Sequence, residues 1–518
     1  MIMRVLMVVF LSVVVTTTLI GCGEPQETLT VIAGSELKDI EPKLDAIAKT
    51  TGVRLQMTYI GTLDGADQIV NGHDQYDLAW FSHAKYLSLL QGQTKRIKSE
   101  EKIGLSPVIP GVKESLARRW GWVDNPNVTW ADIAAKARQG AFRYAMTDPT
   151  ASNSGFSTVM GVQAAFAGSS DAITAEDVDV DKLQAFFSGQ VLTSGSSGWL
   201  ADAYVRDQDR IDGLFNYESI LMNLNASGRL REKLILIYPK EGVVTADYPL
   251  ILLNDIKRAS YVKLVDYLKT SEFQQWMMEN TNRRPVVSRV KASSKFPKGF
   301  QLELPFPSQL EAVNEILFAF LDQHRKPSHS IFVLDVSGSM EGDRLNSLKR
   351  ALLNLTGEDT SLTGRFARFR NREIVTVISF NDAVDVHDNF DIGPQGKGIK
   401  DLRDSVHGLH AGGGTAIYNA LEVAYDIAGD ARAEDPGRFY SIVLMSDGDN
   451  TSGSNYADFN EFYARQQQEL AGIRAFPVLF GGSNDREMNA LAELTGGRVF
   501  VSRKYSLAHV VMKIRGYQ

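Results

Sequence analysis

Short apolar segments alternate with helix-like segments through two long stretches of this sequence, and this alternation limits the fold more than any other feature. In the first stretch, strand-like segments lie at 29–34, 53–61 and 76–82, separated by segments with helical spacing of apolar residues. From residue 330 the same alternation resumes and runs to the end. Strands that alternate with helices form parallel sheets covered by helices, so both stretches predict α/β folds. A chain of 518 residues is too long for one hydrophobic core, so several domains are expected.

Composition excludes two functional classes. The formal net charge is -7 and no basic block is present, so the sequence offers no electrostatic footprint for nucleic acid. Eight scattered histidines and a single cysteine exclude a disulfide framework and a cysteine-rich metal site.

The N-terminus has the pattern of a secretory signal. Arg4 precedes an apolar run from Val5 to Ile20, which is short for a membrane span and contains threonines. The following "LIGC" resembles the bacterial lipobox, which implies removal of residues 1–21, lipidation of Cys22 with acyl chains such as palmitate, and a lipid-anchored spacer at 22–28. The alternative is a plain signal peptide with an incidental cysteine. Either way, we expect an extracytoplasmic location in a bacterial envelope. The sequence does not distinguish anchoring in the inner membrane from anchoring in the outer membrane.

Polar side chains follow the strand-like segments of the first stretch. Helix N-termini at strand ends present N–H groups that bind anions or electron-rich oxygens, and open α/β sheets bind ligands at this edge. The alternative for each residue is a helix N-cap. The expected ligand-binding residues are Ser35, Thr62, Ser82, Ser152, Asn153, Ser154, Tyr217 and Glu218.

Three motifs relate residues 29–300 to a known family. "TDPTASNSGFS" from Thr147, "FNYES" from Phe215 and "EFQQW" with "NRRP" from Glu272 resemble bacterial extracellular solute-binding proteins of the two-lobed, type II kind. The resemblance implies two α/β lobes that close on a small solute, with the chain crossing between them near 130–145 and 240–250. The charge of the solute stays open.

A linker with a connecting helix is expected at 301–328. Val313, Leu317 and Phe320 lie on one face of this segment, whereas its polar face carries few basic residues. This pattern predicts a helix that packs on a neighbouring domain rather than on a membrane.

The sequence "DVSGSM" follows the apolar strand segment that begins at Ser330. Asp335, Ser337 and Ser339 alternate there, and Thr415 and Asp447 come at later loops of the same predicted doubly wound sheet. Five oxygen donors without histidine or thiol suit a hard cation, Mg²⁺ or Mn²⁺.

These three segments are similar to the metal-ion-dependent adhesion site (MIDAS) of von Willebrand factor type A (VWA) domains. The resemblance covers residues 329–518 and implies a Rossmann-like fold. It also implies direct coordination by Ser337, Ser339 and Thr415, with Asp335 and Asp447 holding waters or the ion. An acidic residue of a protein partner would complete the metal shell.

Together these features favour a non-enzymatic, membrane-anchored receptor. Its two-lobed domain would capture a solute, and its metal site would bind a protein partner. The alternative is a surface adhesion or scaffold protein whose two-lobed domain binds proteins. An enzyme is disfavoured because GxSxG, HExxH and two-metal carboxylate clusters are missing from the sequence.

Overall fold

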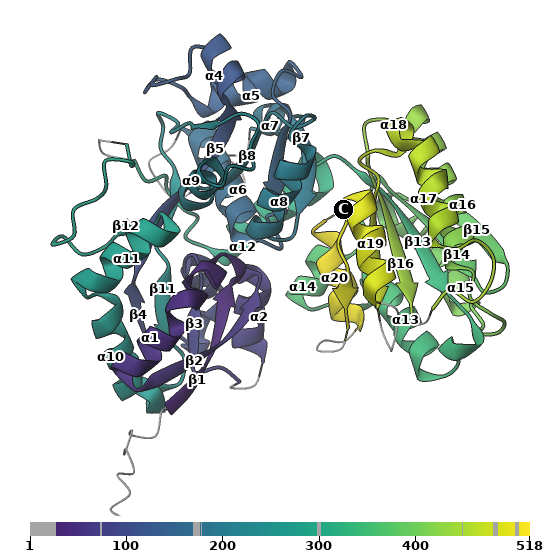
Figure 1. Cartoon of the computed structure of the whole chain (residues 1–518), viewed down its shortest axis with the longest axis horizontal. Coiled ribbons are helices and arrows are strands. Elements are labelled where there is room, and N and C mark those ends of the chain that lie inside the picture. Colours follow the sequence, from purple (N-terminus) through teal and green to yellow (C-terminus); the bar gives the residue numbers. More distant parts are fainter. Residues whose placement is uncertain are drawn as a thin grey trace, which may run out of the picture.

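The computed structural model describes residues 27–72, 75–168, 173, 177, 179–297, 302–447, 449–479, 485–502 and 507–517. The expected signal peptide and Cys22 lie outside these residues. Figure 1 shows a two-lobed module, coloured purple to teal, beside a third α/β unit in green and yellow. No described helix has both the length and the apolar character needed to cross a bilayer.

Lobe one contains a mixed sheet of order β2-β1-β3-β11-β4. Its strands are β1 (Glu27–Gly34), β2 (Val53–Ile60), β3 (Leu78–Trp80), β4 (Ser99–Lys102) and β11 (Pro249–Leu252). The first three pair in parallel, and β11 runs antiparallel to both of its neighbours. Its helices are α1 (Glu41–Thr51), α2 (Thr62–Asn71), α3 (Lys85–Gln91), α10 (Arg258–Leu268) and α11 (Ser271–Thr281).

Lobe two is built around β5 (Gly104–Lys113). The sheet order is β10-β5-β8-β6-β7, and two further strands also pair with β5. The other strands are β6 (Tyr144–Thr147), β7 (Gln190–Ser194), β8 (Gly213–Tyr217), β9 (Leu234–Leu236), β10 (Val244–Ala246) and β12 (Arg284–Pro285). The helices are α4 (Glu114–Arg119), α5 (Trp130–Arg138), α6 (Asn153–Ala167), α7 (Val180–Phe187), α8 (Ser197–Asp207) and α9 (Glu218–Ala226).

The chain crosses between the lobes at three short connections. Ile103 alone separates β4 from β5, Asp247 with Tyr248 separates β10 from β11, and Asn282 with Arg283 separates α11 from β12. The first crossing, expected near 130–145, is therefore placed wrongly by the sequence reading, because those residues lie wholly in lobe two. The second crossing, expected near 240–250, is confirmed. Short connections of this kind form a hinge about which lobes can open.

The connecting helix α12 (Leu310–Ala319) packs on the two-lobed module, as its apolar face predicts. Val313 and Leu317 are buried in one hydrophobic cluster with residues of both lobes. The ring of Phe320, just after α12, lies 4.9 Å from that of Phe187 on α7. The connection between the domains is therefore a packed element rather than a free tether.

The third unit has a doubly wound sheet of order β15-β14-β13-β16-β17-β18. Its strands are β13 (Ser328–Asp335), β14 (Glu373–Phe380), β15 (Val384–Ile392), β16 (Phe439–Ser446), β17 (Arg474–Leu479) and β18 (Phe500–Val501). Its helices are α13 (Asp343–Leu353), α14 (Leu362–Ala367), α15 (Ile399–His407), α16 (Ile417–Glu434), α17 (Tyr456–Arg465), α18 (Gln467–Leu470), α19 (Asp485–Thr495) and α20 (Leu507–Arg515). All pairs are parallel except β14 with β15. The carboxyl ends of β13 and β16 are neighbours at one edge, which places their loops together.

Candidate functional site

The predicted metal-ligating side chains meet above the ends of β13 and β16. The hydroxyl oxygens of Ser337 and Ser339 lie 3.0 Å apart, and Ser339 donates to Asp447 at 2.9 Å. Asp335 accepts from the backbone N–H of Ser337 at 2.9 Å. Four of the five candidates thus form one connected group of oxygens.

The fifth candidate, Thr415, lies in a loop that is hydrogen-bonded to the segment that carries Ser337 and Ser339. The backbone N–H of Gly338 donates to the carbonyl of Gly413 at 3.0 Å. Thr415 is buried, and its N–H donates to the hydroxyl of Thr451 at 2.9 Å. Loops far apart in sequence are therefore held against each other at this edge of the sheet.

The group contains only oxygen donors, which is the chemistry that Mg²⁺ and Mn²⁺ prefer. Burial raises the pKa of Asp335, although hydrogen bonds from Ser337 and Ser446 oppose this shift. In the described part of the chain no three His, Cys, Asp or Glu side chains gather as a metal cluster. Since three of the five candidates carry hydroxyls, the residues present fit a hard cation without such a cluster.

Two neighbours of this site escape sequence reasoning in different ways. Ser446 donates to Asp335 at 2.6 Å, and its position at the end of a strand is a signal that would have found it. Arg344 on α13 forms an ion pair with Asp447 and donates to the carbonyl of Ser339 at 3.1 Å. The sequence pattern around Arg344 contains no feature that points to this contact.

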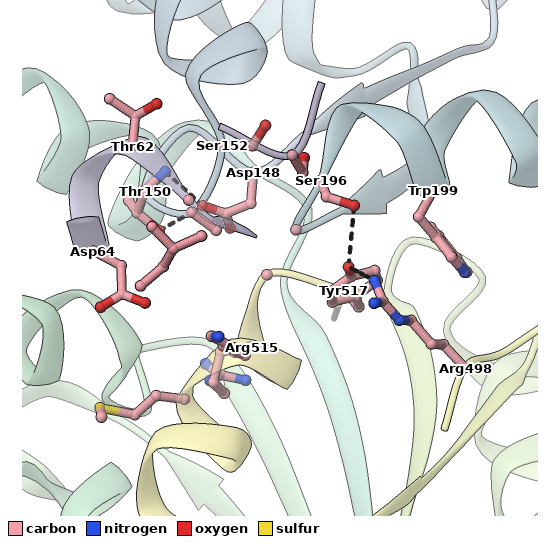
Figure 2. Close-up of a pocket in the computed structure, with 18 of the residues that line it drawn as sticks. Thr62, Asp64, Asp148, Thr150, Ser152, Ser196, Trp199, Arg498, Arg515 and Tyr517 are labelled. Carbon is pink, nitrogen blue, oxygen red and sulfur yellow. Dashed lines mark hydrogen bonds between the residues drawn. The ribbon is translucent and has the colours of Figure 1, made fainter. Parts of the chain in front are cut away.

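A cavity of about 560 Å³ lies where the lobes face each other. Ser35 and Thr62 line it from lobe one, and Ser152 and Asn153 line it from lobe two. Figure 2 shows Thr62, Asp148, Thr150 and Ser152 close together around one part of this cavity. Half of the predicted ligand-binding residues thus border one space.

The other half lie behind the cavity wall. Tyr217 donates to Ser82 across the two lobes at 3.0 Å, and Asn153 donates to Tyr217 at 3.2 Å. The hydroxyl of Ser154 lies 2.8 Å from that of Ser197. Glu218 is fully buried and accepts from Arg284 at 2.8 and 2.6 Å. These side chains position the lobes and the helix starts.

Three buried side-chain oxygens on the cavity residues have no hydrogen-bond partner within the described part of the chain. They are the hydroxyl of Tyr59, Oε1 of Glu36 and Oδ1 of Asn153, and the last two residues are 8% and 3% exposed. Burial raises the pKa of Glu36, against the opposing charge of Arg283. Because buried acceptors without partners are costly, they mark positions where a ligand's donor groups would be stabilised.

Helix N-termini add donors around the same cavity. Helices α2, α6 and α8 all begin at its border, and their N-cap residues make no side-chain capping bond. Their first N–H groups and the positive ends of their dipoles favour electron-rich oxygens. The cavity therefore offers donors and acceptors together.

Known proteins resemble separate parts of this chain. In the solved structure of the periplasmic binding protein P5PA, the likeness is 15% identity with a TM-score of 0.44, covering 58% of this chain and 100% of that one. The periplasmic binding protein AfuA from Actinobacillus pleuropneumoniae, solved with exogenous fructose-6-phosphate bound, is 15% identical with a TM-score of 0.42. The match covers 58% of this chain and 99% of that one.

Among curated proteins, inter-alpha-trypsin inhibitor heavy chain H4 of Sus scrofa is 27% identical over 130 residues, which is 24% of this chain and 13% of that protein. Heavy chain H2 of Homo sapiens is 29% identical over 130 residues, which is again 24% of this chain and 13% of that protein. This chain thus spans about an eighth of the length of these relatives.

Two family profiles match successive parts of the sequence. Residues 29–280 match the bacterial extracellular solute-binding proteins, and residues 331–513 match the von Willebrand factor type A domain. Apart from β12, the strands of the two lobes correspond closely to the first range, and the doubly wound sheet corresponds closely to the second. The chain therefore joins an extracellular solute-binding domain of the bacterial family to a C-terminal VWA domain.

Proposed function

We propose that this protein is a non-enzymatic, lipid-anchored receptor that captures a small polar solute between its lobes and binds an acidic protein partner at its metal site. The observation that carries the solute part is the cavity bordered by Glu36 and Asn153, whose buried acceptors lack partners among the described residues. These acceptors favour N–H or O–H groups on the solute, and the starts of α2, α6 and α8 favour an oxygen acceptor on it.

The metal part of the proposal rests on the clustered oxygens at the ends of β13 and β16. Ser337, Ser339 and Thr415 would bind the ion directly, with Asp335 and Asp447 assisting through water or directly. Mg²⁺ held by neutral hydroxyls supplies a Lewis-acidic position for an external carboxylate. Cys22 would anchor the receptor on the extracytoplasmic face of the membrane.

Native mass spectrometry of the chain without residues 1–22, prepared in Mg²⁺, tests solute capture. We expect a discrete extra mass beyond the metal that is lost on denaturation. Asn153→Ala should lower its occupancy at least tenfold, whereas Asn125→Ala, at an exposed position, should not. No retained mass in the wild-type protein would favour the adhesion alternative.

Calorimetric titration with Mg²⁺ tests the metal site. Asp335→Ala and Thr415→Ala should abolish measurable binding, while Asp401→Ala, on the exposed side of α15, should leave it unchanged. Equal Mg²⁺ affinity in all the variants would contradict the assignment of these ligands.

A further inference from the structure

The VWA domain supplies one side of the cavity between the lobes. Arg498, Lys513 and Tyr517 border the same space as Thr62 and Ser152. Figure 2 shows Arg498 and Tyr517 entering from the VWA side, opposite Ser196 and Trp199 of lobe two. The solute-binding domain alone would leave this side open.

The C-terminal tail is seated closely against lobe two. The ring of Tyr517 meets that of Trp199 edge-on at 5.0 Å, and its hydroxyl lies 3.5 Å from that of Ser196. Arg498 donates to the hydroxyl of Tyr517 at 2.8 Å. A Cβ atom added at Gly195 would lie 2.6 Å from the Tyr517 ring. Lobe two therefore fits this tail without spare room.

A second set of contacts joins lobe two to the VWA domain at the far end of α8. Arg474 on β17 pairs with Asp207 at 2.7 Å, and both side chains are largely buried. Arg206 and Arg210 donate to the carbonyls of Gly496 and Ala471 at 3.0 and 2.7 Å. Partly buried, charge-assisted bonds of this kind fix the orientation of two domains.

Lobe one touches the same domain. Helix α14 packs against α2, and burial raises the pKa of Asp67 on α2, an effect that a hydrogen bond from the hydroxyl of Thr363 on α14 partly opposes. On the same helix, the charge of Asp64 partly offsets the burial that lowers the pKa of Lys513. The VWA domain consequently spans both lobes across the opening that faces away from the hinge.

We propose that the VWA domain is the third wall of the solute site, with Arg498 and Tyr517 as residues that contact the solute. Opening of the lobes about Ile103 and Asp247 moves α2 away from α8, so the VWA domain cannot keep both contacts. Docking of the VWA domain and closure of the lobes are therefore linked. The solute contacts rest on the proposed function, whereas the link between docking and closure does not.

Distances between spin labels test the link without any solute. The chain without residues 1–22 contains no cysteine, so labels can be placed at Lys49 in lobe one, Arg138 in lobe two and Lys400 in the VWA domain, all at exposed positions. The protein is refolded from denaturant beforehand to remove co-purified small molecules. Wild-type protein should give a single, well-defined distance for each pair.

Three variants decide the outcome. Gly195→Val and Arg474→Glu should lengthen the distance from lobe two to the VWA domain and, together with it, the distance between the lobes. Gly198→Val is the matched control, since a Cβ there meets nothing within 4 Å. Lobes that stay closed after undocking, or a VWA domain that stays docked in both test variants, would overturn the inference.

Native mass spectrometry separates this inference from the proposed function. Where wild-type protein retains a solute, Tyr517→Ala and Arg474→Glu should retain at least tenfold less. Equal retention in these variants contradicts the third wall and leaves solute capture standing. A wild-type protein that retains no solute contradicts solute capture, while the label distances still decide the link between docking and closure.

Discussion

Arg344 forms an ion pair with Asp447, one of the proposed metal ligands. A guanidinium and a metal ion compete for the same carboxylate, and the Arg344 side chain is 49% exposed, so solvent screens the pair. Arg344→Ala should therefore raise the affinity for Mg²⁺ by about two- to fivefold, which corresponds to about 0.4–1 kcal/mol. Calorimetric titration measures this, with the exposed Arg350→Ala on the same helix as control. Weaker Mg²⁺ binding in Arg344→Ala would mean that the arginine supports the site.

His83 should make the two-lobed module sensitive to acid. Burial, with the nearby charge of Lys85, lowers the pKa of His83 to about 3. The ring lies in lobe one, 5.8 Å from that of Phe156 in lobe two and 6.0 Å from that of Phe306. Below about pH 6.5 this histidine is protonated in the unfolded chain but stays neutral in the folded chain. The free energy of unfolding therefore falls by up to about 1.4 kcal/mol for each pH unit of acidification.

Unfolding midpoints between pH 7 and pH 4 check this expectation. His83→Gln should flatten the pH dependence, whereas His410→Gln, at an exposed position, should follow the wild type. An unchanged slope in His83→Gln would show that other groups cause the acid sensitivity.

Glu373 should be essential for the position of α20. It is 1% exposed and accepts from Arg515 of α20 at 2.8 and 2.7 Å, and it also pairs with Arg325. Burial opposes its ionisation, yet the two arginines hold its pKa below the usual value. Glu373→Gln leaves two buried guanidinium groups poorly compensated, so we expect a loss of about 3–5 kcal/mol at pH 7.

This loss should shrink with acid, because a carboxyl with a lowered pKa contributes stability above its unfolded pKa and loses it as the pH falls through the folded value. Denaturant unfolding at pH 7 and near pH 3 measures the change, with Glu434→Gln at an exposed position as control. A constant difference at both pH values would contradict the role of the charge.

The buried pair of Glu218 and Arg284 should behave as a structural unit at the lobe junction. Their side chains are 0% and 18% exposed. Arg284→Met strands a buried carboxylate and should cost about 3–5 kcal/mol, and adding Glu218→Gln should recover most of that loss. Arg231→Met breaks an exposed ion pair and should change stability by less than about 0.5 kcal/mol. A double variant no more stable than Arg284→Met would contradict this account.

The sequence reveals the VWA fold well because its strands are strongly patterned. The alternation expected from residue 330 is present as β13, β14, β16 and β17 with helices between them, and Asp335 closes β13. Strand β15 was not predicted, although its polar–apolar alternation is a usable signal for an edge strand. Long, buried strands of this kind depend little on distant context.

Lobe two was harder to derive from sequence. Its central strand β5 contains Pro107 and Pro110, and proline normally argues against a central strand. Missing β5 displaced the expected first crossing from Ile103 to a region inside lobe two. The cavity residues Arg498 and Tyr517 could not be found either, because docking between domains leaves no local periodicity in the sequence.

The place of β11 in the first sheet sets the order in which the chain can fold. This strand lies between β3 and β4, yet it follows more than a hundred residues of lobe two in the sequence. The chain emerges from its N-terminus onward. The five strands in the order β10-β5-β8-β6-β7 of lobe two are therefore all available before β11, which the sheet of lobe one still needs. The edge of β3 that pairs with β11 therefore stays without its partner strand until residues 249–252 have emerged. Newly exported chains are most exposed to aggregation during this interval.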